Sequence, residues 1–159
     1  CQQFLHLQAQ IARLDKMIFA ASRQDKRVRL LQTIPGVGPI TASAIVATIG
    51  EPQRFRSGRD FAAWIGLTPL NKSSGGKERL GRITKMGDRY LRRLLGSGMT
   101  ARIGHARRQP DCVDPWVIRL LGRKPTRLAT IAMANKTARI IWAVLTRQKP
   151  YQAPQFAAA

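Results

Sequence analysis

The sequence predicts a mainly α-helical fold: a helical domain with a tight glycine turn between two helices, a long basic Ser/Gly loop and an amino-terminal coiled-coil-like helix. Apolar residues recur at steps of three and four over most of the chain, the period of a helix with one buried face. Glycines and prolines stand where such runs stop, and strand-like alternation is weak throughout. With 159 residues and 44% hydrophobic content, the chain can bury one core.

Residues 1–26 are predicted to form a coiled-coil-like connector helix. Its seam has apolar residues at alternating steps of three and four, namely Phe4, Leu7, Ile11, Leu14, Ile18 and Ala21. The seam stops where Asp25 takes the place of the next apolar residue. Either the chain's own core or another helix covers this seam. We favour pairing with another helix or another copy of the chain, and a homo-oligomer is expected.

A tight turn between two helices follows the connector. Pro35, Gly36 and Gly38 break the first helix, and Pro39 suits the first turn of the second. Gly36 and Gly38 let the backbone approach a phosphate of DNA or RNA, and the N–H groups at the start of the second helix face that phosphate. The turn resembles the helix-hairpin-helix motif of sequence-nonspecific DNA-binding proteins, and plain helix packing is the alternative.

Further helices follow on either side of one irregular segment. Residues 59–65 are predicted to form a short helix that Gly66 ends. Residues 67–87 are rich in Gly, Ser and Pro, so they form either a long loop or a short hairpin. A helix resumes at Asp88, which suits its cap. The apolar stripe of this helix consists of Leu91, Leu94, Leu95, Met99 and Ile103.

The carboxy-terminal part is predicted to contain a short apolar element at residues 116–121 and a long helix at residues 125–147. The buried face of the long helix is expected to consist of Leu128, Ile131, Ala134, Ala138, Ile141 and Leu145. Residues 27–149 then form the main domain, and residues 150–159 form a loose tail.

The net charge of +20 makes a polyanion the expected partner. Eight scattered carboxylates are too few to bind magnesium without help from outside the chain, and two His with two Cys cannot form a four-ligand zinc site. We therefore expect no metal ion or other cofactor on this chain. The sequence lacks a membrane-spanning run and a signal peptide, so a soluble cytoplasmic protein is expected. It begins at Cys1 within a predicted helix, which indicates a piece of a longer protein.

Residues 71–93 form the most basic stretch, with eight Lys or Arg residues against Glu78 and Asp88, a net charge of +6. The expected nucleic-acid contacts in this stretch are Lys72, Lys77, Arg79, Arg82, Lys85, Arg89, Arg92 and Arg93. A nucleotide-binding P-loop is excluded, because Asn71 stands where its first glycine is required and Glu78 where its Ser or Thr is required.

Ser73 and Ser74 precede Gly75 and Gly76 within the basic stretch. The two glycines allow a bulky phosphodiester to approach closely, so they join the expected nucleic-acid contacts. A serine Oγ there can face the phosphorus, while nearby cations stabilise the charge that develops on its oxygens. Residue types alone favour a plainer alternative, a flexible Ser-Gly turn with solvated charges.

Several motifs, in order along residues 30–145, resemble the carboxy-terminal transposase domain of insertion-sequence family 110. This is the 116/902-like group of DEDD transposases, which are relatives of pilin-gene invertases. The motifs are Ile-Pro-Gly-Val-Gly at 34–38, Gln-Arg-Phe at 53–55, Phe-Ala-Ala-Trp-Ile-Gly-Leu-Thr-Pro at 61–69, Ser-Gly at 74–75, Arg-Ile-Thr-Lys-Met-Gly at 82–87 and Leu-Arg at 91–92. The helix before them fits the coiled-coil connector of that family.

The resemblance implies a DNA recombinase whose serine nucleophile is carried on this chain, at Ser74 or alternatively at Ser73. It also implies an amino-terminal RNase H-like domain with four acidic ligands for Mg²⁺, a noncoding guide RNA that selects the DNA, an oligomer and a bacterial, nucleoid-associated location. Because the acidic domain is missing from this chain, we expect the chain alone to be inactive.

Two other classes of function compete with a recombinase. A noncatalytic nucleic-acid-binding module would use the glycine turn and the basic stretch to hold the phosphate backbone, without forming a covalent bond to DNA. A ribosome-associated basic protein would account for the net charge of +20 but not for the ordered set of motifs.

Overall fold

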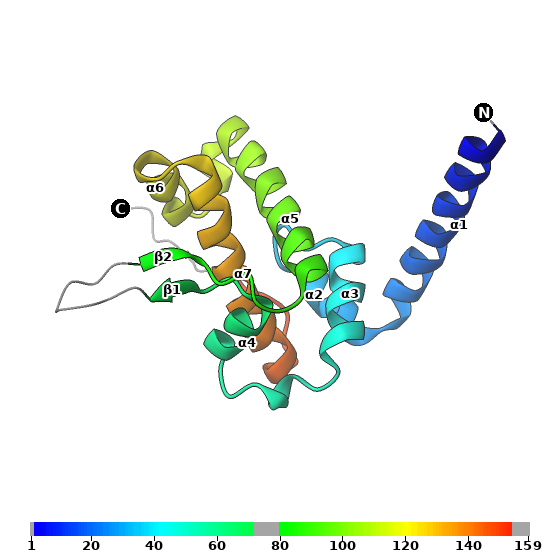
Figure 1. Cartoon of the computed structure of the whole chain (residues 1–159), viewed down its shortest axis with the longest axis horizontal. Coiled ribbons are helices and arrows are strands. Elements are labelled where there is room, and N and C mark those ends of the chain that lie inside the picture. The colour runs from blue at the N-terminus through cyan, green and yellow to red at the C-terminus, as the bar shows by residue number, and fades with distance from the viewer. Residues whose placement is uncertain (1, 72–79, 154–159) are drawn as a thin grey trace.

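The computed structural model describes residues 2–71 and 80–153 of the chain, which are mostly helical (Figure 1). The helices are α1 (Gln2–Gln24), α2 (Lys26–Gln32), α3 (Pro39–Ile49), α4 (Gly58–Ile65), α5 (Arg89–Arg108), α6 (Pro115–Arg123) and α7 (Thr126–Arg147). The described part also contains the 3₁₀ turns η1 (Pro52–Arg54) and η2 (Pro110–Cys112) and the strands β1 (Pro69–Asn71) and β2 (Leu80–Ile83). The predicted mainly α-helical class is confirmed.

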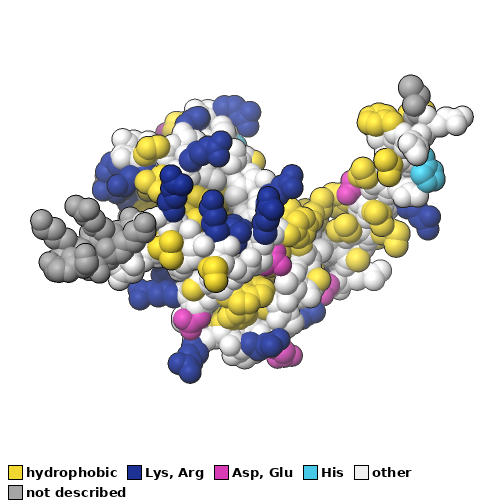
Figure 2. Space-filling model, viewed as in Figure 1, with side chains coloured by type: hydrophobic (Ala, Val, Ile, Leu, Met, Phe, Trp, Pro, Cys, Tyr) yellow, Lys and Arg dark blue, Asp and Glu magenta, His cyan; other side chains and the backbone are white. Residues whose placement is uncertain are grey.

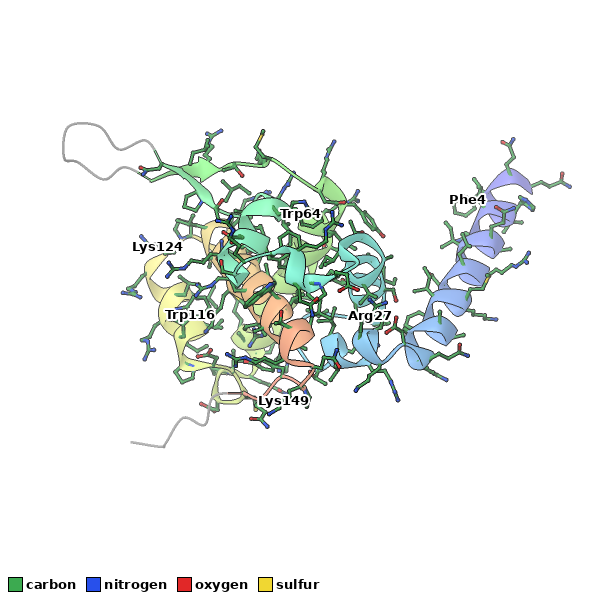
Figure 3. The ribbon with its side chains drawn as sticks, turned by 90° about the horizontal axis from the view of Figure 1, so that it is seen from below. Phe4, Arg27, Trp64, Trp116, Lys124 and Lys149 are labelled. Atoms are coloured by element: carbon green, nitrogen blue, oxygen red, sulfur yellow. The ribbon has the colours of Figure 1, made fainter. Side chains whose placement is uncertain are left out.

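Helix α1 projects away from the other helices, and Phe4 lies near its far end (Figures 1 and 3). The predicted seam is exposed along the first half of the helix, with exposed fractions of 64% for Phe4, 57% for Leu7, 59% for Ile11 and 56% for Leu14. The other end of α1 packs against α2 and α3. Within the described residues, the chain's own core therefore does not cover the first half of the seam.

Helix α2 begins directly after Asp25, which caps it by accepting a hydrogen bond from the Arg27 N–H at 2.7 Å. Burial tends to raise the pKa of Asp25, but hydrogen bonds and positive charge from Arg27 outweigh this effect, so the pKa lies below its ordinary value. The sequence predicted that the α1 seam stops at Asp25 but not that a new helix starts there.

The core surrounds α7, which packs against α2, α4, α5 and α6. The buried residues of α7 are Ala129, Met133, Ala134, Thr137, Ala138, Ile141, Val144 and Leu145. Among the described helices, α7 is the one whose length and composition would allow it to cross a bilayer, and 44% of that apolar stretch is buried inside the protein. Core helices of globular proteins have the same composition.

The sequence predicted that Leu128 and Ile131 are buried on α7. This prediction was wrong for Leu128 and was confirmed only in part for Ile131. Leu128 is 52% exposed, and Ile131 is half-buried. Ala129 and Thr137 take inner positions instead, and the Thr137 hydroxyl lies 3.3 Å from the Met99 sulfur of α5. The small residues on this face allow α5 to pack closely, which turns Leu128 toward solvent.

The strands β1 and β2 pair antiparallel, with Pro69 opposite Ile83 and Asn71 opposite Leu80 and an irregular step between these pairs. Of the two alternatives for residues 67–87, the short hairpin is therefore correct. Residues 72–79, which connect the strands, lie outside the described residues.

Candidate nucleic-acid interface

Backbone hydrogen bonds fix the base of the β1–β2 hairpin to the carboxyl end of α4. The Thr84 N–H donates to the Thr68 carbonyl at 2.9 Å, and the Lys85 N–H donates to the Gly66 carbonyl at 3.2 Å. Gly66 ends α4, as predicted, and adopts the left-handed conformation with φ of 81°. The base of the hairpin is thus attached to the helical body.

Gly66 and Gly87 make this junction tight. A side chain on Gly66 would overlap the Met86 backbone, and a side chain on Gly87, where φ is 101°, would overlap the Trp64 carbonyl oxygen. Lys85 also has a positive φ, of 55°, which costs a residue with a side chain roughly 1–2 kcal/mol. Close packing against α4 therefore dictates the path of the chain from β2 into α5.

Arg92 strengthens the same junction from α5. Its Nη1 donates to the Ile65 carbonyl at 2.7 Å, and its side chain is half-buried. Asp88 caps α5, as predicted, by accepting a hydrogen bond from the Leu91 N–H at 2.8 Å. The sequence placed Arg92 among the nucleic-acid contacts, whereas the structure shows its guanidinium bonded to the protein backbone.

Four of the other predicted cations, Arg82, Lys85, Arg89 and Arg93, lie at or next to this junction with exposed side chains. In the part of the chain that the structure describes, none of them forms an ion pair with a carboxylate. Figure 2 shows many Lys and Arg side chains and few acidic ones on the face that carries α5. No carboxylate within the described residues therefore offsets the charge of these four cations, which suits them to contact a polyanion.

Met86 and Tyr90 are exposed between these cations, by 73% and 56% respectively. Sequence analysis did not select either residue. Tyr90 precedes the buried Leu91 and falls off the apolar stripe of α5, so the helical period already indicated its exposure. An exposed aromatic ring among cations can stack on a nucleobase.

The predicted glycine turn between α2 and α3 packs against α5. Gly36 has a φ of 86°, and a side chain there would overlap the end of the Met99 side chain. A side chain on Gly98 would in turn overlap the Gly36 carbonyl oxygen. Gly38 is exposed and begins α3 without a side-chain cap, and Pro39 occupies the first turn, as predicted. Gly36 and Gly38 are both exposed, and Gly36 also lies against Met99 and Gly98 of α5.

The carboxylates of the described residues do not form a metal centre. No group of three His, Cys, Asp or Glu side chains within residues 2–71 and 80–153 could hold an ion. Asp25, Asp88 and Asp114 cap the helices α2, α5 and α6 instead. The resemblance assigns the four acidic Mg²⁺ ligands to an amino-terminal domain and not to these capping residues.

Seven of the predicted site residues lie within residues 72–79, outside the described part of the chain. They are Lys72, Ser73, Ser74, Gly75, Gly76, Lys77 and Arg79. The structure describes the residues on either side, because Asn71 and Leu80 face each other across the hairpin.

Residues 28–112 match the model of the transposase family IS116/IS110/IS902. The chain is 46% identical over 146 residues to a probable family 20 transposase of Pseudomonas aeruginosa, covering 92% of this chain and 43% of that protein. It is 37% identical to the transposase for insertion sequence element IS1111A of Coxiella burnetii, and the match covers 94% of this chain and 41% of that protein. It is 29% identical to the pilin gene-inverting protein of Moraxella bovis, and the match covers 92% of this chain and 46% of that protein.

The chain thus spans less than half the length of each of these three relatives. The family match covers the glycine turn, α4, the hairpin base and α5, the elements that form the junction described above. From the matched family model and these relatives, the chain belongs to the IS116/IS110/IS902 family of transposases.

Proposed function

We propose that this chain is the nucleophile-bearing domain of an insertion-sequence transposase and that Ser74 attacks a DNA phosphodiester. In that step the serine Oγ forms a bond to phosphorus, and the bond from phosphorus to one strand oxygen breaks. The serine proton passes to a base outside the described residues, and the leaving strand oxygen takes up a proton to become a hydroxyl. The phosphoserine retains the bond energy, so the strand can be resealed without ATP.

The observation that carries this proposal is the set of exposed cations at the hairpin base, which form no ion pair with any carboxylate of the described residues. Arg82, Lys85 and Arg89 follow the serine-containing segment closely in sequence, and the base itself is fixed to α4. Cations held this way position a phosphate and offset the charge of its oxygens during attack. Arg92 acts as a positioning residue, because its guanidinium bonds to the Ile65 carbonyl.

The complete protein is proposed to have further parts and partners. They are an amino-terminal RNase H-like domain with Mg²⁺, a noncoding guide RNA, the DNA substrate and other copies of the chain. Association through α1 is supported by the exposed seam from Phe4 to Leu14. These partners place the complete protein at the bacterial nucleoid in the cytoplasm.

A noncatalytic nucleic-acid-binding module is the second candidate, favoured by the α2–α3 turn. Gly38 is exposed at the start of α3, and a phosphate can lie against the N–H groups there as in a helix-hairpin-helix motif. In this alternative the hairpin cations hold the backbone and no covalent bond to DNA forms.

A covalent DNA adduct distinguishes the two candidates. The full-length transposase with guide RNA and Mg²⁺ is incubated with labelled DNA. A denaturing gel then separates DNA that is covalently linked to protein from free DNA. Protease digestion of the linked species should increase its mobility. Ser74→Ala is expected to abolish the adduct while DNA binding stays close to wild type, and Ser73→Ala is the matched control that retains it. If Ser74→Ala still forms the adduct, Ser74 is not the nucleophile. If only Ser73→Ala loses the adduct, the nucleophile is Ser73.

A further inference from the structure

Helix α5 contains three glycines, at positions 96, 98 and 104. Glycine inside a helix makes the helix less stable than alanine does. Each of the three glycines is therefore expected to have a structural role. Gly98 has one, because a side chain there would overlap the Gly36 carbonyl oxygen. A Cβ on Gly96 would meet no described atom within 4 Å. Packing among the described residues therefore does not require a glycine at position 96.

Gly96 lines a hollow of about 790 Å³ between α5 and α7. Arg93, Ser97 and Thr100 line it from α5, and Thr126 and Arg127 line it from α7. These five side chains are exposed, so the hollow is an open groove on the surface. The groove lies beside the predicted nucleic-acid contacts, because Arg93 belongs to both.

The groove has the composition of a phosphate-binding surface. Its lining contains two arginines, several hydroxyls and no carboxylate. A third arginine, Arg107, donates from Nη2 to the Thr126 hydroxyl at 2.7 Å. Among the described residues, Arg93, Arg107 and Arg127 form no ion pair. Arginine and hydroxyl side chains supply most contacts between proteins and the nucleic-acid backbone.

We propose that the groove between α5 and α7 binds the phosphodiester backbone of a nucleic-acid strand, and that Gly96 allows this strand to lie directly against α5. This inference rests on the proposed function and adds a second contact surface to the hairpin base. Arg93 and Arg127 bind phosphates from opposite helices, and the Ser97 hydroxyl donates a hydrogen bond to a phosphate oxygen. The Thr100 hydroxyl donates to the Gly96 carbonyl at 2.9 Å and lines the groove without donating to the strand. Because all these contacts are to the backbone, the groove holds a strand without reading its sequence.

A neutral substitution that fills the groove tests its shape separately from its charge. Gly96→Leu places a side chain in the groove, and the matched control Gly104→Leu makes the same change on the same helix outside the lining. Neither Cβ meets a described atom within 4 Å, so both variants are expected to melt at or above the wild-type temperature. Fluorescence anisotropy measures the binding of labelled 20-nucleotide DNA, RNA of the same sequence and duplex DNA.

Gly96→Leu is expected to weaken binding about tenfold or more, the effect of losing one charge-assisted hydrogen bond, while Gly104→Leu stays within about twofold of wild type. A larger loss with RNA than with DNA identifies the strand as RNA, and the reverse identifies it as DNA. If both glycine variants bind all three probes like the wild type, the groove proposal is wrong. That result leaves the serine chemistry untouched, since the Ser74 adduct tests it independently.

The charge of the groove is tested by the double variant Arg93→Gln with Arg127→Gln. Two lost phosphate contacts should flatten the slope of log affinity against log salt by about 1.8 for duplex DNA and about 1.4 for single strands. Arg54→Gln with Arg56→Gln removes the same charge from exposed sites outside the groove. An equal change of slope in both pairs would show that the chain attracts nucleic acid only through its net charge, which would overturn the groove.

Discussion

Replacing two residues of the exposed α1 seam tests the proposed association through this helix and should shift the protein toward a monomer. The variant is Leu7→Glu with Leu14→Glu, and these leucines are 57% and 56% exposed. Complete burial of a leucine side chain contributes roughly 1.5–3 kcal/mol. Burying the part of each leucine that is still exposed should therefore contribute roughly 1–2 kcal/mol per residue to the free energy of association. Two residues in each of two copies then contribute about 4–8 kcal/mol, which corresponds to a roughly 10³- to 10⁶-fold weaker dimer.

The control adds the same charges to the opposite face of α1, through Gln2→Glu with Ala9→Glu. Both residues lie at heptad positions that face away from the predicted seam, so the mass of the control should equal that of the wild type. Sedimentation velocity or light scattering over a range of protein concentrations measures the mass, and circular dichroism checks that each variant folds.

Two results would refute this reasoning. A wild-type chain that is monomeric at high concentration would show that the seam does not pair with another copy. An unchanged oligomer in the leucine variant, with the fold intact, would place the interface elsewhere on the chain. In either case the exposed residues of α1 would need another partner, such as a missing segment of the full-length transposase.

Three further outcomes are expected. Arg92→Ala should lower the free energy of unfolding by roughly 1.5–3 kcal/mol in urea titrations, because the Ile65 carbonyl loses a charged donor at 2.7 Å, and Arg92→Lys should lose less. Asp25→Ala should cost about 0.5–2 kcal/mol at neutral pH. Since folding lowers the pKa of Asp25, its contribution is complete above about pH 3.9 and is lost as the pH falls through the folded-state pKa, so wild type and variant should converge in acid. Binding to nucleic acid should weaken roughly 10³- to 10⁵-fold between 50 and 200 mM salt if six to ten phosphates are contacted, and a flat salt response would contradict a polyanion partner.

Local signals predicted those features of the fold that neighbouring residues determine. Gly66 ends α4, Asp88 caps α5 and Pro39 occupies the first turn of α3, each as the sequence indicated. In these cases a single backbone conformation or one short hydrogen bond decides the structure. The exposed seam of α1 was equally readable, because its period does not depend on the rest of the chain.

Features that depend on contacts between distant segments were not predictable in this way. The phosphate contact predicted at Gly36 stays a prediction, and the sequence did not indicate that Gly36 also packs against α5. Arg92 looked like one cation among eight, and only the position of the α4 carboxyl end turns it inward. Leu128 fitted a helical stripe, but small residues on the neighbouring face determined which side of α7 is buried. In each case the contact joins segments that are far apart in the sequence.

Helix α5 carries residues of both proposed contact surfaces, which meet at Arg93, and so sets how far they extend together. Arg89 stands at the hairpin base and Thr100 in the groove, eleven residues further along the helix. At 1.5 Å per residue this separation is about 16 Å, which corresponds to roughly five phosphates at the spacing of one strand in B-form DNA. The helical rise fixes this distance, and the contacts of Arg92 with α4 and of Gly98 with the α2–α3 turn fix the position of α5 relative to the hairpin base. A strand lying along the groove would therefore reach the hairpin base in a fixed register, which is what attack by a serine on one particular phosphate requires.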